Sequence, residues 1–341
     1  MEEAAVRPIL AIDLGGTQIR AALVTPELEV LQRRAVATDD QEGVDAVVQR
    51  ICSLAQQVID AAHAASLPDP VGLGISAPGP LDPWRGIVLQ PPNLAGWRDV
   101  PLVERVEAAV GLSTFLERDT NVAVMAEWRH GAARGTDDAI YVTVSTGIGG
   151  GIISAGRPLI GKDGDAGEVG HVTVEIDGPI CGDGAPGHVE AISSGTAIAR
   201  EGRALLDAGT APRLAEAFAA SGATELGAEH VAQAADEGDE ACRAVLDRAW
   251  VALGALAASL VNLLNPEAIV LGGSIAEHRP ELFEVVRREV DRRAFPIPAR
   301  RVRIVPAEHG GDVSLIGLLP IVNERLHDSA FRRGVPTTVN A

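Results

Sequence analysis

The chain has 341 residues, of which 46% are hydrophobic and only 3% aromatic, and its formal net charge is −18. This length fits two domains of ordinary size, whose cores must be built mainly from Ala, Val, Leu and Ile. The negative charge argues against a nucleic-acid partner, which a basic surface would favour, and three widely separated cysteines suggest no disulfide framework.

The termini and apolar runs give no targeting signal. The first eight residues carry Glu2, Glu3 and Arg7 without the apolar segment of a secretion signal. The longest apolar stretches, such as residues 251–264, are interrupted and too short to span a bilayer. We therefore expect a cytoplasmic protein in a reducing setting, with no membrane partner.

The predicted elements alternate between strands and helices, which indicates an α/β fold. The first half contains, in chain order, strands at 9–14, 19–24 and 29–37, a helix at about 42–65, a strand at 71–75 with a loop at 76–80, a short strand at 115–117, and a helix that starts at Asn121. The helix at 42–65 keeps an apolar stripe of period 3.6.

The second half continues this alternation. Its predicted elements are a strand at 139–144, a glycine hairpin at 145–151, a loop-rich segment at 156–187, helices at about 190–206 and 240–264, a strand at 268–271, a final helix at 314–326 and a loose tail at 327–341.

Two glycine turns, each between two apolar runs, are the most informative feature. In the first, Asp13-Leu14-Gly15-Gly16-Thr17, glycines permit close backbone approach, and the amides and the Thr17 hydroxyl can face phosphate oxygens. Asp13 could hold magnesium directly or through water. The second turn, residues 145–151, repeats the pattern. The second turn is neither a P-loop nor a Rossmann turn, and an ordinary hairpin is the alternative interpretation of the first.

The pair of turns resembles the actin–hexokinase ATPase architecture, in which two related domains face each other across a cleft and each contributes a phosphate loop. Within that superfamily, residues 9–326 resemble the ROK (repressor, open reading frame, kinase) family of sugar kinases and regulators. The resemblance implies a two-domain, ribonuclease H-like α/β fold. Its small domain would be residues 1–120 with a returning helix at about 314–326, and its large domain residues 121–313. It also implies ATP and Mg²⁺ as cofactors and a homodimer.

The resemblance also assigns the nucleotide side of the site. Asp13 would help hold Mg²⁺, and the phosphates would be cradled by Gly15, Gly16, Thr17, Thr146, Gly147, Gly149 and Gly150. The run from Asn265 to Gly273 matches the family's helix–strand–glycine turn, which places Gly272 and Gly273 near adenosine. A Gly-Gly pair after a buried strand is also a plain turn.

Asp119, between a strand and a helix, matches the family's catalytic aspartate. Phosphoryl transfer needs a carboxylate that takes the proton of the acceptor hydroxyl. In the competing reading Asp119 or Asn121 is a helix N-cap, and Asn121 suits the cap while Asp119 faces the cleft. The family commonly has Asn where this chain has Arg118, which changes charge and donor geometry beside the sugar.

The sugar side follows from the same resemblance. The residues expected to contact the sugar are Gly79, Asn93, Arg118, Asp119, Glu168, His171 and Glu190. Charged carboxylates accept strong hydrogen bonds from hydroxyls. An Asn in a Pro-rich loop, such as Asn93, is otherwise most often a turn former.

A zinc segment lies between these residues. The family holds a structural zinc with one His and three Cys. This chain has His171 and Cys181, but Asp183 and His188 at the other two positions. Each replacement can itself bind zinc, and the alternative is a loop that closes without metal.

These features predict an ATP-dependent hexose kinase, with conversion of glucose to glucose 6-phosphate as the leading activity. An N-acetylglucosamine or N-acetylmannosamine kinase is the alternative enzyme. A sugar-responsive regulator would need a helix-turn-helix segment, for which the residues before Ile9 leave no room. A non-catalytic sugar-binding protein is disfavoured by the intact Asp119.

Overall fold

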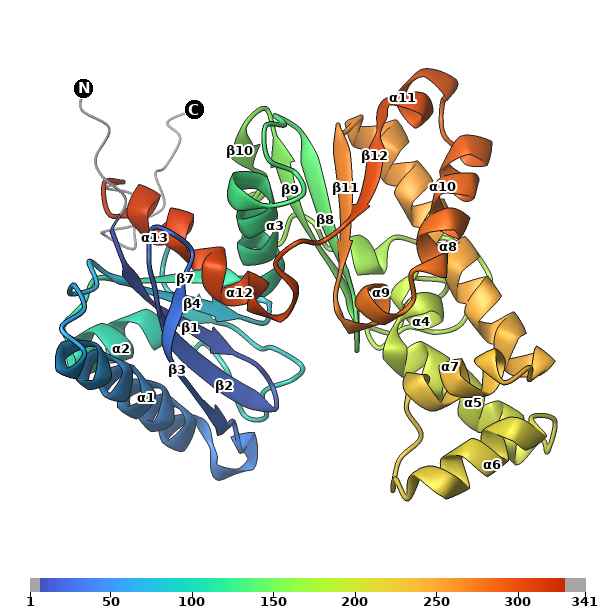
Figure 1. Ribbon diagram of the computed structural model, residues 1–341, viewed down its shortest axis with the longest axis horizontal. Coiled ribbons are helices and arrows are strands. Elements are labelled where there is room, and N and C mark those ends of the chain that lie inside the picture. The colour runs from blue at the N-terminus through green and yellow to red at the C-terminus, as the bar shows by residue number, and fades with distance from the viewer. Residues whose placement is uncertain (1–6, 329–341) are drawn as a thin grey trace. The chain divides into compact units, whose positions relative to one another are not determined.

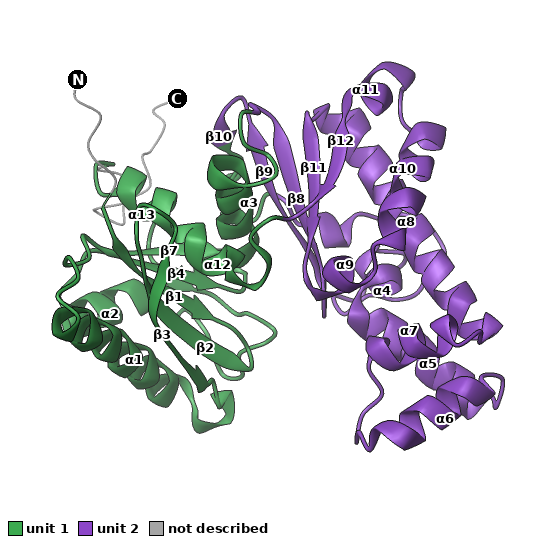
Figure 2. Cartoon of the chain, viewed as in Figure 1, with its two compact units in different colours: residues 1–135, 158–166, 308–341 green, residues 136–157, 167–307 purple. Residues whose placement is uncertain are grey.

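The structure is a computed structural model that describes residues 7–328, and Figure 1 shows the course of the chain. The chain divides into two compact units, which are coloured separately in Figure 2. Unit 1 comprises residues 1–135, 158–166 and 308–341, and unit 2 comprises residues 136–157 and 167–307. This division differs from the expected boundary after residue 120, because the helix that follows residue 118 packs within unit 1. Most of the expected tail, residues 329–341, lies outside the described residues.

Unit 1 contains a five-stranded sheet in the order β3-β2-β1-β4-β7. Its strands are β1 (Ile9–Leu14), β2 (Gln18–Val24), β3 (Val30–Ala37), β4 (Leu73–Ala77) and β7 (Thr114–Arg118). β1 pairs antiparallel with β2 and parallel with β4, which in turn pairs parallel with β7. A small hairpin, β5 (Leu81–Asp82) and β6 (Ile87–Val88), follows β4.

Two helical layers cover this sheet. On one side lie α1 (Val44–Ala64) and α2 (Leu102–Val110), preceded by the 3₁₀ turn η1 (Asp40–Glu42), and their apolar faces pack on alternate residues of β1, including Leu10, Ile12 and Leu14. On the other side lie α3 (Asp119–His130), η3 (Gly310–Asp312), α12 (Val313–Ile316) and α13 (Leu318–Arg325). Side chains alternate along a strand, so Asp13 projects toward the side of α12 and α13.

Unit 2 repeats the sheet topology of unit 1. Its strands are β8 (Ala139–Val144), β9 (Ile148–Ser154), β10 (Arg157–Pro158), β11 (Ala268–Gly272) and β12 (Arg303–Pro306), in the order β10-β9-β8-β11-β12. β8 pairs antiparallel with β9 and parallel with β11, as β1 does with β2 and β4. The two glycine turns therefore occupy equivalent places, one in each opening hairpin.

The helices of unit 2 gather around its longest helix, α8 (Glu240–Leu264). It packs against α4 (Glu190–Ser193), α5 (Gly195–Asp207), α7 (Ala228–Asp236) and α10 (Glu281–Arg293) (Figure 1). The remaining elements are η2 (Val169–His171), α6 (Pro212–Ser221), α9 (Ser274–His278) and α11 (Pro296–Arg301).

By length and composition α8 is apolar enough to cross a membrane, so the expectation that no apolar stretch is long enough was wrong. The helix is nevertheless a core element. Its residues Leu253, Leu256 and Val261 are buried in the same apolar cluster as the strand residues Ile140 and Ile269.

Predicted strands and helices occur where expected, with most ends shifted by at most two residues. Two predicted helices are each divided. The helix at 190–206 breaks at Ser194, which has an extended backbone and caps α5 by accepting from the Ala197 amide at 3.1 Å. The final helix breaks at Gly317, where an added Cβ would lie 1.9 Å from the carbonyl oxygen of Val122 in α3. The Ser194 cap sets the first interruption, and the absence of a side chain at Gly317 allows α3 to approach closely at the second.

Candidate active site

Asp119 is an accessible carboxylate between buried neighbours. It is the first residue of α3, directly after the fully buried strand β7. Its side chain is exposed, whereas Arg118 and Thr120 are buried. Its Oδ1 atom accepts a hydrogen bond from the Thr120 amide at 2.7 Å. The first turn of a helix favours negative charge, so this position suits a carboxylate that must be charged and reachable.

Glu117 organises the segment around Asp119 and was not singled out in the sequence. Its Oε1 atom accepts from the Arg118 amide and from Asn121 Nδ2, both at 2.9 Å. Its Oε2 atom forms an ion pair with Arg325, whose Nη1 also donates to the carbonyl of Leu116 at 3.0 Å. The buried Glu117–Arg325 pair fixes the end of β7. The expectation that Asn121 caps the helix was wrong, because α3 begins two residues earlier, at Asp119. The side-chain amide of Asn121 instead donates to Glu117.

Arg118 links three segments of unit 1. It is only 3% exposed. Its side chain lies against Gly79, where an added Cβ would be 3.1 Å from Arg118 Cδ, and its guanidinium donates to the carbonyl of Ala166. Arg118 therefore ties the loop after β4 and the segment 158–166 to the start of α3, next to the accessible Asp119.

The first glycine turn joins β1 to β2 and contacts the loop that carries Asn93. The Gly15 amide donates to the carbonyl of Gln18 at 3.0 Å, so it closes the turn itself. An added Cβ on Gly16 would lie 2.8 Å from the carbonyl oxygen of Asn93. Thr17 and Asn93 are both exposed. Unit 1 thus brings together the glycine turn and Asn93, which the sequence assigned to phosphate and sugar.

Asp13 occupies the last position but one of β1, and its carboxylate is partly buried. Arg20, directly opposite on β2, donates two hydrogen bonds to it. The sequence patterns did not single out Arg20, although a basic residue opposite an acid in a predicted hairpin is a detectable signal.

The second glycine turn is shorter than expected, because Gly149, Gly150 and Gly151 belong to strand β9. The turn proper is closed by the Ser145 amide, which donates to the carbonyl of Gly147 at 3.0 Å. Two of its carbonyls accept from the first turn of α5: Ser145 from the Gly195 amide at 2.8 Å, and Thr146 from the Thr196 hydroxyl at 2.9 Å.

Glu190 connects this turn to the loop of Cys181. Its Oε2 atom accepts from the Ile148 amide at 2.8 Å, and an added Cβ on Gly147 would lie 2.8 Å from the same oxygen. The Cys181 thiol lies 3.8 Å from Glu190 Oε1 and donates to it. Glu190, expected as a sugar contact, therefore also has contacts within the protein.

Packing accounts for the glycine requirement at three further positions. An added Cβ on Gly150 would lie 2.7 Å from Val169, and one on Gly272 would lie 2.3 Å from the Tyr141 hydroxyl. Gly273 has a φ of +89° and abuts Thr143 and Val144. Close approach within unit 2 thus requires glycine there, independently of any nucleotide.

The structure brings all four expected zinc ligands together. Donor atoms of His171, Cys181, Asp183 and His188 lie within 4.8 Å of one another. The two histidine Nδ1 atoms are 3.3 Å apart, and they lie 3.0 and 3.2 Å from Asp183 Oδ2. Ligand atoms about 2.0 Å from a tetrahedral zinc ion are roughly 3.3 Å apart. The donor set therefore fits Zn²⁺, and the three separations among the His171, His188 and Asp183 donors match a tetrahedral ion.

The local charges shape this cluster. Burial raises the pKa of the Cys181 thiol, and the carboxylates of Glu190 and Asp183 raise it further. The Ala185 amide lowers the pKa of Asp183, with help from the two imidazoles. A metal must displace the thiol proton, which makes binding pH-dependent. The exposed Glu168 lies with Oε2 3.9 Å from His171 Nε2, on the side of the ring away from these donors.

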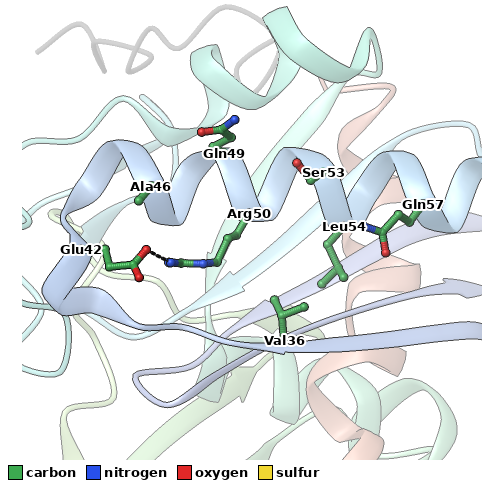
Figure 3. Close-up of a pocket in the computed structure, with 8 residues that line it drawn as sticks. All are labelled: Val36, Glu42, Ala46, Gln49, Arg50, Ser53, Leu54 and Gln57. Atoms are coloured by element: carbon green, nitrogen blue, oxygen red, sulfur yellow. Dashed lines mark hydrogen bonds and ion pairs between the residues drawn. The ribbon is translucent and has the colours of Figure 1, made fainter.

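A surface hollow of about 320 Å³ lies elsewhere in unit 1, along α1 and β3. Figure 3 shows its lining, where Arg50 forms an ion pair with Glu42. Its lining residues include none of the residues expected to bind nucleotide, sugar or metal.

Comparison with known proteins gives consistent relatives. The ROK family matches residues 9–325. A glucokinase of Thermotoga maritima is 33% identical over 93% of this chain and 98% of the relative. An N-acetylmannosamine kinase of Salmonella arizonae is 31% identical over 90% of this chain and 96% of the relative.

Among solved structures, a ROK family glucokinase from Streptomyces griseus in complex with glucose and AMPPNP is similar, with a TM-score of 0.79 and 31% identity over 93% of this chain and 99% of that one. The predicted fold class, an actin-like ATPase fold, is thereby confirmed. The repeated sheet topology, the accessible Asp119 and the match over residues 9–325 lead to one conclusion: the chain belongs to the ROK family.

Proposed function

We propose that this chain is an ATP-dependent sugar kinase that phosphorylates a hexose, with glucose to glucose 6-phosphate as the leading reaction. The observation that carries the proposal is Asp119: an exposed carboxylate at the start of α3, held by a buried network around Glu117. The similarity to glucokinases over more than nine-tenths of the chain supports the reaction class.

In this proposal Asp119 is the general base. Its carboxylate accepts the proton of the acceptor hydroxyl as the oxygen attacks the terminal phosphorus, and the bond from that phosphorus to the bridging oxygen of the nucleotide breaks. ADP leaves, and the phosphate remains on the sugar oxygen. Asn93, Glu168, His171 and Glu190 would bind sugar hydroxyls.

ATP and Mg²⁺ are the proposed cofactors. Asp13 would hold the ion, directly or through water, because hard cations prefer oxygen ligands. Mg²⁺ neutralises the phosphate charge that develops during transfer. The nucleotide would contact the two glycine turns through Gly16, Thr17, Thr146 and neighbouring backbone, and would lie near Gly272 and Gly273. Gly15 and Gly147 shape their turns.

Zn²⁺ is the proposed structural metal of unit 2, held by His171, Cys181, Asp183 and His188. The donor spacing given above supports this assignment. The ion would fix the loop between η2 and α4 and thereby orient His171. A zinc-free loop is the alternative to be tested.

The second candidate acceptor is N-acetylmannosamine or N-acetylglucosamine. It is supported by the similarity to the N-acetylmannosamine kinase. We also propose a cytoplasmic homodimer that binds no nucleic acid, in keeping with the net charge of −18.

The deciding experiment is a coupled ADP-release screen of the purified chain over glucose, mannose, fructose, N-acetylglucosamine and N-acetylmannosamine. We expect the highest kcat/KM with glucose. A higher value with an N-acetylated sugar would favour the second candidate. Sugar binding by calorimetry without turnover on any sugar would indicate a non-catalytic sugar-binding protein.

A further inference from the structure

Arg20 contacts Asp13 through two of its guanidinium nitrogens. The two residues are directly opposite each other in the β1–β2 pair. Arg20 Nε lies 3.0 Å and Nη2 2.6 Å from the same carboxylate oxygen, Asp13 Oδ2. The side chains are 25% and 15% exposed, so the pair is only partly screened by water, and charge-assisted bonds of this kind are the strong ones.

The guanidinium is in turn held from the other side. Nη2 also lies 2.9 Å from the Ser314 hydroxyl at the start of α12, and Nη1 donates to the carbonyl of Gly311 at 2.7 Å. A guanidinium is planar, so contacts at Nε, Nη1 and Nη2 fix its orientation. The segment 311–314, nearly 300 positions later in the chain, therefore sets the direction from which Arg20 meets Asp13.

This geometry fixes the Asp13 carboxylate. Both bonds from Arg20 end on Oδ2, and neither ends on Oδ1. Rotation of the carboxylate would break two charge-assisted hydrogen bonds, so Oδ1 keeps one direction. A ligand oxygen of Mg²⁺ must be presented in near-octahedral geometry, and groups that orient a metal ligand affect metal affinity strongly.

We propose that Arg20 is the positioning residue of the first glycine turn: it holds the Asp13 carboxylate so that Oδ1 is presented to the metal–nucleotide. The inference rests on the proposed role of Asp13. It assigns to Arg20, Ser314 and Gly311 a function in metal-dependent nucleotide binding, carried out without contact between Arg20 and substrate.

The competing explanation is that Arg20 only stabilises the packing of the segment 311–314 on the sheet. The chain offers a matched control for this, because Arg33 on β3 forms an ion pair of 2.6 Å with Asp312 in the same segment. Arg33→Gln removes a sheet-to-segment ion pair without altering Asp13.

The test is titration calorimetry of the full-length chain with ADP, at 5 mM Mg²⁺ and in excess EDTA, for the wild type and four variants: Arg20→Gln, Arg20→Lys, Arg33→Gln and Asp13→Asn. Loss of a group that orients a metal ligand typically costs about 10–100-fold in affinity. We expect Arg20→Gln to weaken ADP binding in the presence of Mg²⁺ by that factor and to raise the KM for Mg–ATP. The affinity for ADP measured in excess EDTA should stay unchanged. Arg20→Lys keeps the positive charge but loses the planar guanidinium. We expect its affinity for ADP in Mg²⁺ to lie between those of the wild type and Arg20→Gln.

The outcomes separate the inference from its premise. Wild-type affinity in Arg20→Gln beside weakened Asp13→Asn overturns the role of Arg20 alone. Wild-type affinity in both variants overturns the role of Asp13 and the inference with it. An equal loss of ADP affinity in Arg33→Gln would show that Arg20 only connects the sheet to the segment 311–314. Tighter Mg²⁺-dependent ADP binding in Arg20→Gln would show that the positive charge of Arg20 repels the metal. Either result overturns the inference. If Arg20→Gln does not fold, Arg20→Lys decides on the same terms.

Discussion

Asp119→Asn separates chemistry from folding more sharply than any other change in this chain. The substitution keeps size and shape but removes the capacity to take a proton. A positioned general base contributes about 10² to 10⁴ in rate, which corresponds to roughly 3–5 kcal/mol of activation free energy at 1.36 kcal/mol for each factor of ten.

The structure limits the expected effect on stability. Asp119 is exposed and stands in the first turn of α3, where a negative charge contributes typically 0.3–1 kcal/mol. Asn retains an oxygen that can accept from the Thr120 amide, as Asp119 Oδ1 does at 2.7 Å. We therefore expect the free energy of unfolding to fall by at most about 1 kcal/mol, and Tm by no more than about 4 °C.

The assay is a coupled ADP-release measurement of kcat and KM for the best sugar, with Tm from thermal denaturation and sugar affinity from calorimetry. Glu104→Gln is the matched control, since it neutralises another exposed acid in the first turn of a helix of unit 1. Turnover within tenfold of wild type in Asp119→Asn would refute the assignment of the base. A loss of activity accompanied by a fall in Tm as large as that of a core substitution would also refute it, because unfolding would then explain the loss.

Three further predictions follow from the other parts of the site. Gly16→Val should weaken ATP binding measured by calorimetry and lower Tm, because its Cβ alone would lie 2.8 Å from the Asn93 carbonyl and overpacking costs about 1–3 kcal/mol. Unchanged ATP affinity in folded Gly16→Val would contradict the phosphate assignment. Arg118→Asn should change the order of KM values among the sugars more than it changes the KM for ATP, because it removes the contacts with Gly79 and Ala166. An unaltered order would show that Arg118 does not determine sugar specificity. Elemental mass spectrometry of protein purified without added metal should find about one zinc per chain. A chelator should then lower both Tm and the affinity for sugar. Absence of zinc together with full activity in chelator would establish a metal-free loop.

The sequence determined many of the local elements and, through the family resemblance, the zinc candidates, whereas α2, α6, α7, α10 and β12 were not predicted. Apolar period and turn residues are properties of neighbouring positions, so the hairpin at residues 9–24 and the helix at 240–264 could be predicted from them. The cluster of His171, Cys181, Asp183 and His188 could also be predicted, because the resemblance to the family's zinc segment implied it and one loop can bring these residues together.

Only the tertiary structure decided how the reactive groups are supported. Glu117 pairs with Arg325 across 208 positions, and Arg20 bonds Ser314 across 294. The same holds for the requirement for glycine at position 317, which the close Val122 carbonyl of α3 imposes. Such contacts arise where distant segments meet on a sheet face, and no local pattern encodes which segments meet. Periodicity reports which face of an element is buried, whereas the partner on that face is set by the packing of the whole unit.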